Sequence, residues 1–368
     1  MPSLSKSIFL FFFAIILSYS SSKALNPPIV SGAFIQLNSN NASNDAPWWQ
    51  EVVANMSKIG IDTIIIQYSA IDSISFYPVK NLEISEYYSL SPQNNNPIES
   101  ILAAADKTNI TVFLGLGLEQ SFVTNYNSRT NQFEFDYDKN LVIVKAKLIL
   151  DELYQTYGYK TDDNSGHKSL QGWYLPNELS DADIIRSGHK VFLADILDYY
   201  SQLSNYAHEK TGLKTMISPY FAAANSFTDA EPRQFDKYAK WWQEVLDNKQ
   251  ANRLYLDIIA HQDSVGVGHL SINEASIYLR RLEPIVNQYG LEFWANLEAF
   301  RVDKNNNFAS AKFTDFKKQI EAYQGIVDKE IMFEFSTYME GPSNKLFDNY
   351  LNYLCPKNSF YTQPNCSR

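Results

Sequence analysis

Residues 170–178 read LQGWYLPNE and residues 291–300 read LEFWANLEAF, and these two stretches decide the fold. Each contains a short, nearly continuous apolar run (170–175 and 291–297), which is typical of a strand buried on both faces. Such strands form parallel sheets whose faces are covered by helices. Six further runs of this kind are found at residues 30–37, 63–68, 111–118, 214–221, 254–260 and 330–335. The sequence therefore predicts eight parallel strands.

Helix signals lie between these runs. Asp45 and Pro47 predict the start of the first helix, and Gly60 predicts its end. Ser271 and Glu274 match a capping box at the start of another helix. The other helices are expected from residue 97, at 139–157, at about 181–210 as one helix or two, around 241–242, at about 309–323 and at about 344–353. A strand followed by a helix, eight times, predicts the α/β class and a single (β/α)8 TIM barrel. A doubly wound open sheet is the alternative, but it rarely has eight such evenly alternating units.

The first 24 residues are expected to be a signal peptide, followed by one barrel domain at residues 25–368. Lys6 supplies the positive charge, residues 8–17 are apolar, and small residues stand at Ser22 and Ala24. An apolar run of about ten residues is too short to cross a bilayer, which takes about 20. An uncleaved anchor is the alternative. No later stretch reads as a transmembrane helix, so we expect a secreted or extracytoplasmic protein without membrane association after cleavage.

An exported protein meets an oxidising compartment, so Cys355 and Cys366 are expected to form a disulfide that closes a short loop near the C-terminus. Four sequons also predict a glycoprotein if the source is eukaryotic. They begin at Asn41, Asn55, Asn109 and Asn365.

The charge pattern gives no sign of a nucleic-acid partner. The chain has 31 Lys and Arg against 41 Asp and Glu, a net charge of −10, and its basic residues are scattered. The five histidines show no zinc-site spacing, and Gly115 and Gly117 lack the third glycine of a dinucleotide-binding loop. We therefore expect no cofactor and no metal, and we expect a monomer.

Two glutamates, Glu178 and Glu298, directly follow the fourth and seventh predicted strands. In TIM barrels the chemistry lies at the C-terminal ends of the strands, so both carboxyls are expected at the same end. Hydrolysis of a glycosidic bond uses such a pair, one protonated to assist the leaving oxygen and one ionised. Each glutamate alone is more often a helix N-terminal charge or an ion-pair partner than a catalyst, but the pair predicts glycoside hydrolysis.

The pair resembles the superfamily of retaining barrel glycosidases in which the acid/base ends strand four within Asn-Glu and the nucleophile ends strand seven. Asn177-Glu178 matches the first motif and Glu298 the second. The resemblance implies that Glu178 is the acid/base, that Glu298 is the nucleophile, and that Asn177 binds the 2-hydroxyl of the sugar. Carboxyl oxygens about 5–5.5 Å apart would accompany retention and about 6.5–9.5 Å inversion.

Four segments are similar to blocks of the glycosidase-like barrel family known as domain of unknown function 4434. They are residues 172–178 (GWYLPNE), 217–221 (ISPYF), 262–266 (QDSVG) and 294–300 (WANLEAF). They cover strands four to seven, and this family implies a barrel fold and glycosidase chemistry without naming a substrate.

The chain also departs from the wider superfamily. Leu179 stands where many members carry Pro, strand six ends in His261-Gln262-Asp263, and strand eight lacks the usual Trp. Asp263 is the main rival to Glu298 as base or nucleophile; its alternative role is to hydrogen-bond the loop at residues 266–268. Glu119 and Glu334 are weaker acidic candidates. The residues expected to line the sugar site, with simple packing as the alternative for each, are Gln67, Tyr68, Tyr220, Gln262, Asp263, Asn296, Glu334 and Tyr338.

Together these features predict a secreted glycoside hydrolase that acts on an oligosaccharide or polysaccharide with retention of configuration. Two alternatives remain at this point, a non-catalytic polysaccharide-binding barrel and a transglycosidase. The first would bind a glycan without cleaving it, and the second would pass the glycosyl group to a sugar instead of water.

Overall fold

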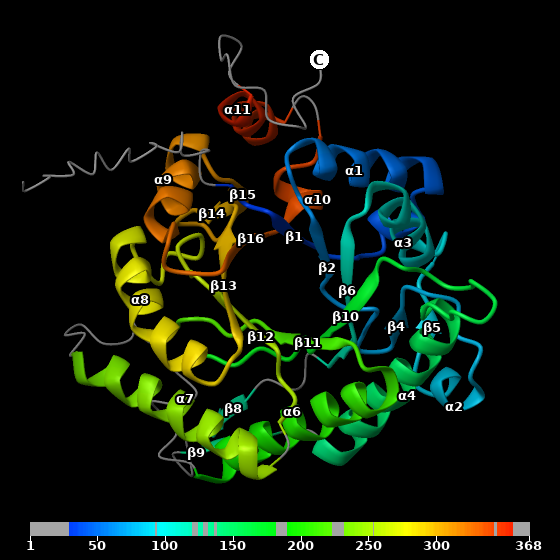
Figure 1. Ribbon diagram of the computed structural model, residues 1–368, viewed down its shortest axis with the longest axis horizontal. Helices are drawn as coiled ribbons and strands as arrows, with labels where there is room; N and C mark the ends of the chain where they lie inside the picture. The colour runs from blue at the N-terminus through cyan, green and yellow to red at the C-terminus, as the bar shows by residue number, and fades with distance from the viewer. Residues whose placement is uncertain are drawn as a thin grey trace, which may run out of the picture.

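The computed structural model describes residues 29–355 except 93, 120–123, 128–131, 136–137, 182–189, 223–231, 253 and 342–343. Eight parallel strands close into a barrel with helices around it (Figure 1). In chain order they are β1 (Gly32–Ile35), β2 (Thr63–Ile66), β6 (Thr111–Gly115), β10 (Leu170–Tyr174), β11 (Lys214–Ile217), β12 (Ile258–Gln262), β13 (Glu292–Glu298) and β16 (Lys329–Phe333). Each strand pairs with its neighbours in this order, and β16 pairs with β1. The predicted (β/α)8 barrel is confirmed.

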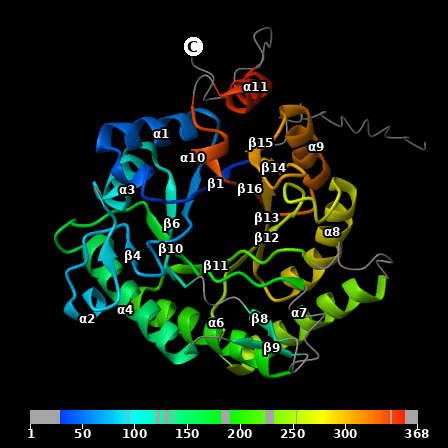
Figure 2. The same ribbon diagram turned by 180° about the vertical axis from the view of Figure 1, so that it is seen from behind.

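The helices form a ring around the barrel, as both face views show (Figures 1 and 2). They are α1 (Ala46–Lys58), α3 (Pro97–Thr108), α4 (Lys139–Tyr157), α6 (Lys190–Thr211), α7 (Pro232–Asn252), α8 (Ile272–Gln288), α9 (Phe313–Tyr323) and α11 (Lys345–Leu354). The capping box of Ser271 and Glu274 is present at α8, and the Asp45 carboxylate accepts the first hydrogen bond of α1. Of the fourth helix, expected at about 181–210, residues 182–189 lie outside the described residues. The predicted signal peptide (residues 1–24) and Cys366 also lie outside them.

Several predicted boundaries were wrong. The third strand, expected at 111–118, ends at Gly115, and the fifth, expected at 214–221, ends at Ile217. The helix expected from residue 309 begins at Phe313, because residues 308–310 form β15 (Phe308–Ser310), which pairs with β14 (Phe300–Val302) as a hairpin. Strand six was expected at 254–260 and lies at 258–262. Leu254 and Leu256 are buried in the layer between barrel and helices, so their apolar character reflects packing before the strand begins.

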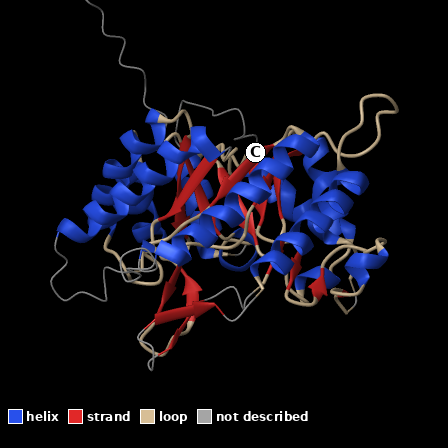
Figure 3. Cartoon of the chain, turned by 90° about the horizontal axis from the view of Figure 1, so that it is seen from below, coloured by secondary structure: helices blue, strands red, loops and turns tan. Residues whose placement is uncertain are grey.

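Smaller elements extend from the C-terminal ends of the strands. They are η1 (Asn41–Ser43), β3 (Ala70–Ile71), β4 (Ile74–Ser75), α2 (Leu82–Ser85), β5 (Ser89–Leu90), β7 (Gly117–Leu118), β8 (Thr124–Asn127), β9 (Gln132–Phe135) and α10 (Phe335–Tyr338). The β8–β9 hairpin projects from one end of the barrel (Figure 3). Among the described residues, no helix has the length and apolar character needed to cross a membrane.

The barrel interior is an apolar plug contributed by alternate residues of the strands. It consists of Phe34, Ile65, Phe113, Tyr174, Met216, Ile258, Ala260, Trp294 and Ile331, with Phe333 packed against it. The intervening strand residues face the helices and belong to the larger outer core. This alternation fixes which polar residues at the strand ends face the barrel axis.

Helix α11 contacts the segment before β1, near the place where β16 pairs with β1 and closes the barrel. The Tyr350 hydroxyl of α11 accepts a hydrogen bond from the backbone N–H of Val30 at 2.8 Å, just before β1. Tyr350 is fully buried, so its ring also belongs to the outer core. Helix α11 is thereby attached to the segment that enters β1.

Candidate active site

The polar residues at the C-terminal ends of β11, β12 and β13 continue the inward-facing rows of the plug. Asn296 and Glu298 follow Trp294 at two-residue steps on β13, and Gln262 follows Ala260 in the same way on β12. Ser218 follows Met216 just beyond β11. An apolar plug thus ends in a layer of hydrogen-bonding side chains.

Ser218 connects these side chains through hydrogen bonds. The Gln262 amide donates to the Ser218 carbonyl at 2.9 Å, and the Asn296 amide donates to the Ser218 hydroxyl at 3.1 Å. The hydroxyl in turn donates to the Ala260 carbonyl at 2.7 Å. Ser218 was not predicted as a site residue, although its two-residue step from the apolar Met216 would have indicated an inward position.

Glu178 lies four residues beyond Tyr174, the last residue of β10, and is exposed to solvent. The Tyr174 hydroxyl, which rises from the plug, donates to its carboxylate at 3.4 Å. Desolvation by the surrounding protein raises the pKa of Glu178 to about 7, although hydrogen bonds from Gln262 and Tyr174 oppose the rise. Glu178 is therefore both open to solvent and protonated in part at neutral pH. Tyr174 was also not predicted, because a tyrosine within a buried strand is typical of packing.

Glu298 is the last residue of β13 and is buried. The backbone N–H of Val267 donates to its carboxylate at 2.8 Å, from the loop that follows β12. A Cβ on Gly266 would lie 2.7 Å from the Cβ of Glu298, so only glycine allows the loop to come this close. Burial, followed by the negative charge of Asp263, raises the pKa of Glu298.

Asn177 precedes Glu178 and is buried. Its side-chain oxygen accepts a hydrogen bond from the Tyr199 hydroxyl at 2.5 Å, which leaves its amide nitrogen as the free group. Among the described residues this nitrogen has no hydrogen-bond partner, and neither does the side-chain oxygen of Asn296. A buried donor and a buried acceptor without partners are costly in a finished core, so these two atoms are candidates to bind a ligand.

Asp263 has the opposite orientation to Gln262 and faces the helices. It is fully buried, and the groups that donate to it are the N–H of Val265, the N–H of Glu298, the amide of Gln319 and the hydroxyl of Tyr323. The structure therefore places Asp263 behind Glu298 and not beside it at the barrel axis.

The other predicted residues are spread around the rim. Gln67 accepts a hydrogen bond from the Gln36 amide at 2.8 Å, and burial raises the pKa of Tyr68 to about 12. Glu334 is buried at the start of α10, where Ser336 donates to it through both N–H and hydroxyl. Gln36, an inward residue after β1, was not predicted.

The remaining three candidates have separate environments. Tyr338 packs against Phe300 with tilted rings whose centroids lie 5.1 Å apart, and Tyr220 is partly buried beyond β11. Glu119 forms an ion pair with Lys145 at 2.9 Å, which is the ordinary structural role for such a residue.

No group of three or more potential metal ligands occurs among the residues the structure describes. His261 faces away from the axis, and burial lowers its pKa to about 3. Its Nε2 lies 2.7 Å from the Tyr238 hydroxyl of α7, and its ring stacks on Phe221. It therefore forms part of the outer core.

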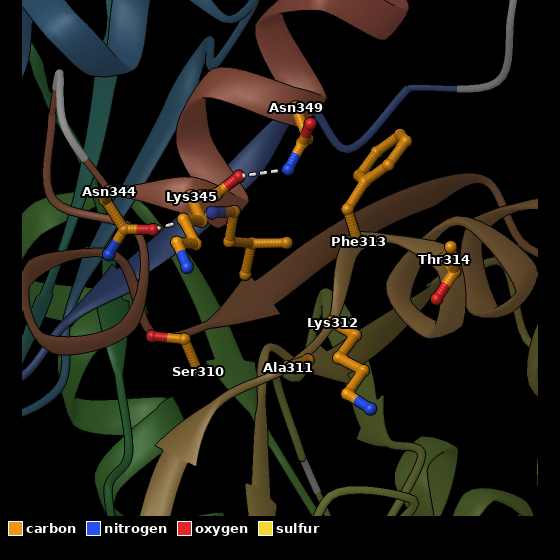
Figure 4. A pocket seen from close by; sticks show the side chains of 9 residues that line it. Ser310, Ala311, Lys312, Phe313, Thr314, Asn344, Lys345 and Asn349 are labelled. Atoms are coloured by element: carbon orange, nitrogen blue, oxygen red, sulfur yellow. Dashed lines mark hydrogen bonds between the residues drawn. The ribbon is translucent and has the colours of Figure 1, made fainter.

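A separate cavity of about 660 Å³ lies where α9 and α11 begin (Figure 4). It is lined by Ser310, Ala311, Lys312, Phe313, Thr314, Asn344, Lys345, Leu346 and Asn349. None of the predicted site residues lines it, so it is distinct from the layer around the two glutamates.

Comparison with known proteins identifies the family and the fold of this chain. The model of the family described as domain of unknown function (DUF4434) matches residues 30–346. The crystal structure of a proposed alpha-L-fucosidase from Bacteroides thetaiotaomicron has a TM-score of 0.69 at 24% identity, covering 89% of this chain and 96% of that one. An endo-beta-1,4-mannanase from Thermotoga petrophila has a TM-score of 0.53 at 11% identity, covering 91% and 79%.

The glycoside hydrolase domain of PgaB (BpsB) from Bordetella bronchiseptica also has a TM-score of 0.53, at 9% identity, covering 90% of this chain and 100% of that one. No curated protein sequence matches this chain. At these identities the structural likeness establishes the fold, and the family model confirms the predicted family.

Proposed function

This chain belongs to the family described as domain of unknown function (DUF4434), and from that premise we propose that it is a glycoside hydrolase acting on an oligosaccharide or polysaccharide. The similar structures are named a fucosidase, an endo-mannanase and a glycoside hydrolase domain, which supports the reaction class. The substrate is proposed only as a carbohydrate.

The observation that carries the proposal is the pair of carboxyls at one end of the barrel, both with raised pKa values. Glu178 follows β10 and Glu298 ends β13, and the inward layer of Gln262, Ser218 and Asn296 spans the strands between them. Raised carboxyl pKa values are costly for folding and are typical of acid–base sites. The exposed Glu178, with a pKa of about 7, has the properties of the general acid.

The proposed mechanism retains configuration. The ionised Glu298 attacks the anomeric carbon while the Glu178 proton passes to the leaving oxygen, so the glycosidic bond breaks and a glycosyl ester forms. Glu178 then takes a proton from water, the water oxygen bonds to the anomeric carbon, and the Glu298 carboxylate is released. The N–H of Val267 favours the ionised Glu298 at both ends of this cycle.

The unpartnered atoms of the site match the chemistry of a sugar. The Asn177 amide nitrogen is a donor, and the Asn296 side-chain oxygen is an acceptor. A sugar hydroxyl donates and accepts, so it can satisfy both kinds of group. We propose that Asn177 binds the hydroxyl next to the anomeric carbon, as the superfamily resemblance implies.

The proposal includes export, with cleavage after Ala24, a disulfide between Cys355 and Cys366, and a monomeric mature protein. Mass spectrometry of the protein secreted by an expressing host would test the first two. An N-terminus at Leu25, with a mass that rises by two hydrogens on reduction, is the expected result. Retention of residues 1–24 or a free thiol would contradict these parts, and light scattering would test the monomer.

The central experiment measures sugars released from a glycan panel by the mature protein, Glu178→Gln and a matched control, Glu292→Gln. Glu292 begins the same strand that Glu298 ends, so it lies at the opposite end of the barrel. We expect release by the wild type and the control, and a loss of about 10²-fold or more in Glu178→Gln. Equal release by all three proteins would contradict the assignment.

The same panel separates the two alternatives. Glycan binding without release by any of the three proteins would indicate a binding barrel. Products longer than the substrate would indicate a transglycosidase, because a sugar would then have accepted the glycosyl group in place of water.

A further inference from the structure

We propose that Asp263 is a positioning residue for Glu298, which holds the backbone of β13 and the loop after β12 in one arrangement and controls when Glu298 ionises. The proposal rests on the function proposed above. It also gives Asp263 a role different from that of a nucleophile, because its carboxylate faces the outer core.

The first part of the arrangement is the backbone on which Glu298 is carried. One oxygen of Asp263 accepts the N–H of Glu298 and the N–H of Val265, both at 3.2 Å. The last residue of β13 and the loop after β12 are therefore bound to a single atom. Charge-assisted hydrogen bonds of this kind are stronger than neutral ones and fix the geometry of both partners.

The same loop then returns to the Glu298 side chain. Two residues after Val265, the N–H of Val267 donates to the Glu298 carboxylate at 2.8 Å. A loop that moved away from Asp263 would carry this donor with it. Asp263 thus determines both where the Glu298 carboxylate lies and which donor meets it.

The second oxygen of Asp263 is bound by α9. It accepts from the Gln319 amide at 2.6 Å and from the Tyr323 hydroxyl at 3.1 Å. The side-chain oxygen of Gln319 accepts from Arg301 at 2.6 Å, so its NH₂ group must face Asp263. Arg301 also donates to the carbonyl of Glu298 at 3.2 Å. The peptide groups on both sides of Glu298 are therefore held by one network.

The titratable and charged groups around Asp263 and Glu298 come from several elements. They are Asp263 after β12, Arg301 on β14, Tyr323 on α9, Glu330 on β16 and Tyr338 on α10. Burial, followed by the charge of Asp263, raises the pKa of Glu330 to about 9, so this carboxyl is neutral at pH 7.

The two closest charges act on Glu298 in opposite directions. Asp263 raises the pKa of Glu298 and Arg301 lowers it. Burial raises the pKa of Asp263 itself, but its four donors favour the ionised form, so Asp263 is the carboxyl of the pair that loses its proton first. Removing the charge of Asp263 should therefore make Glu298 easier to ionise.

Asp263→Asn tests this, because the Asn side-chain oxygen still accepts the two N–H groups while the charge is gone. The measurement is the titration of the Glu298 carboxyl by ¹³C NMR in protein labelled at glutamate, assigned by its absence in Glu298→Gln. We expect the pKa of Glu298 to fall by about one unit. Asp257→Asn, at the opposite end of β12, is the control and should leave it unchanged.

Arg301→Gln is the second variant, on a partly exposed residue that is easier to replace without unfolding. It should shift the titration in the opposite direction, to higher pH. Opposite shifts support the proposal, and an unchanged or equally directed shift in folded Arg301→Gln overturns it even if Asp263→Asn does not fold.

The NMR titration needs no substrate, so a failed glycosidase assay would leave this test intact. With an active enzyme, the limb of the pH profile of kcat/KM that reports the ionisation of Glu298 should move to lower pH in Asp263→Asn. A purely structural role would lower activity without moving that limb.

Discussion

The two ends of β10 carry titratable groups in opposite situations. In the connection that enters the strand, His167 lies 2.8 Å from Asp106 and 3.3 Å from Glu99, both on α3. Burial alone would lower the pKa of His167, but these partners raise it. Beyond the other end of the strand, the partners of Glu178 among the described residues are the neutral Tyr174 and Gln262, and desolvation by the surrounding protein raises its pKa.

The difference separates a stabilising cluster from a reactive one. Where opposite charges meet, each favours the charged form of the other, and the pair stabilises the folded state. Where a carboxyl is desolvated without a cation, folding is penalised and the group keeps a proton that it can give away. In TIM barrels the N-terminal end of the strands mainly supports stability and the C-terminal end carries the chemistry, and β10 follows this division.

The largest effect is expected when the two glutamates are compared with different leaving groups. Glu298→Gln should lower kcat by about 10⁴-fold or more on every substrate, because no covalent intermediate can form. Glu178→Gln should be much less impaired on an aryl glycoside with an acidic leaving group, which departs without a proton. Steady-state kinetics on aryl glycosides and natural linkages would show this. The same loss on both substrate types for both variants would remove the distinction between acid and nucleophile.

The next effect concerns how Glu298 is held. In Gly266→Ala the new Cβ would lie 2.7 Å from the Cβ of Glu298 and 2.7 Å from the carbonyl of Phe300, so the loop must move. A displacement of about 1 Å can cost about 10²-fold in rate, and we expect a loss of that order in kcat. Val267→Ala keeps its backbone N–H and serves as the control. Full activity in Gly266→Ala would mean that the loop does not determine the position of Glu298.

A smaller effect is expected from the partner of Glu178. Tyr174→Phe removes a hydrogen bond that favours the ionised carboxylate, so the pKa of Glu178 should rise. Because the general acid must be protonated, the alkaline limb of the kcat/KM profile should move to higher pH, by up to about one unit. Tyr157→Phe, which loses a bond to Asn96 on the outer layer, is the control. A shift to lower pH would contradict the acid assignment.

The smallest effect belongs to the other end of the strand. A raised His167 pKa stabilises the fold fully below about pH 6.5 and loses this contribution as the pH rises through the folded-state pKa. The lowered pKa values of Glu99 and Asp106 contribute above about pH 4 and are lost as the pH falls. His167→Asn should therefore cost about 1 kcal/mol between about pH 4 and 6.5, an amount reduced by the solvent exposure of Glu99.

Thermal unfolding at pH 5.5 and pH 8.5 would measure this cost. We expect a lower Tm by about 2 °C at pH 5.5 and a smaller difference at pH 8.5. An equal loss at both pH values would show that His167 contributes by packing alone.

The barrel could be predicted because each strand is an apolar run between helix caps, and because Glu178 and Glu298 follow two such runs directly. The orientation of the site residues could not be predicted, because it depends on which face of its strand each residue occupies. His261, Gln262 and Asp263 are consecutive, yet only Gln262 continues the inward row. Sequence places all three at the strand end, whereas the pairing of β12 with β11 and β13 decides their directions.

Ser218 and Tyr174 were missed for a related reason. A serine after a strand and a tyrosine within one have no distinctive chemistry until neighbouring strands bring partners to them. Their partners, Gln262 and Asn296 for Ser218 and Glu178 for Tyr174, come from other strands or from beyond a turn. Such contacts arise from tertiary structure, which local patterns do not record.

The hydrogen bond between Tyr350 and Val30 can form only late in the synthesis of the chain. The ribosome synthesises Val30 first and Tyr350 320 residues later. Strand β1 therefore cannot pair with β16, or bind Tyr350, until nearly the whole chain has been made. Contacts so distant in sequence slow folding. We expect a nascent chain ending at residue 328, before β16 begins, to remain an open sheet in which one edge of β1 is unpaired. The finished barrel is therefore a product of the completed chain and not of its growing N-terminal part.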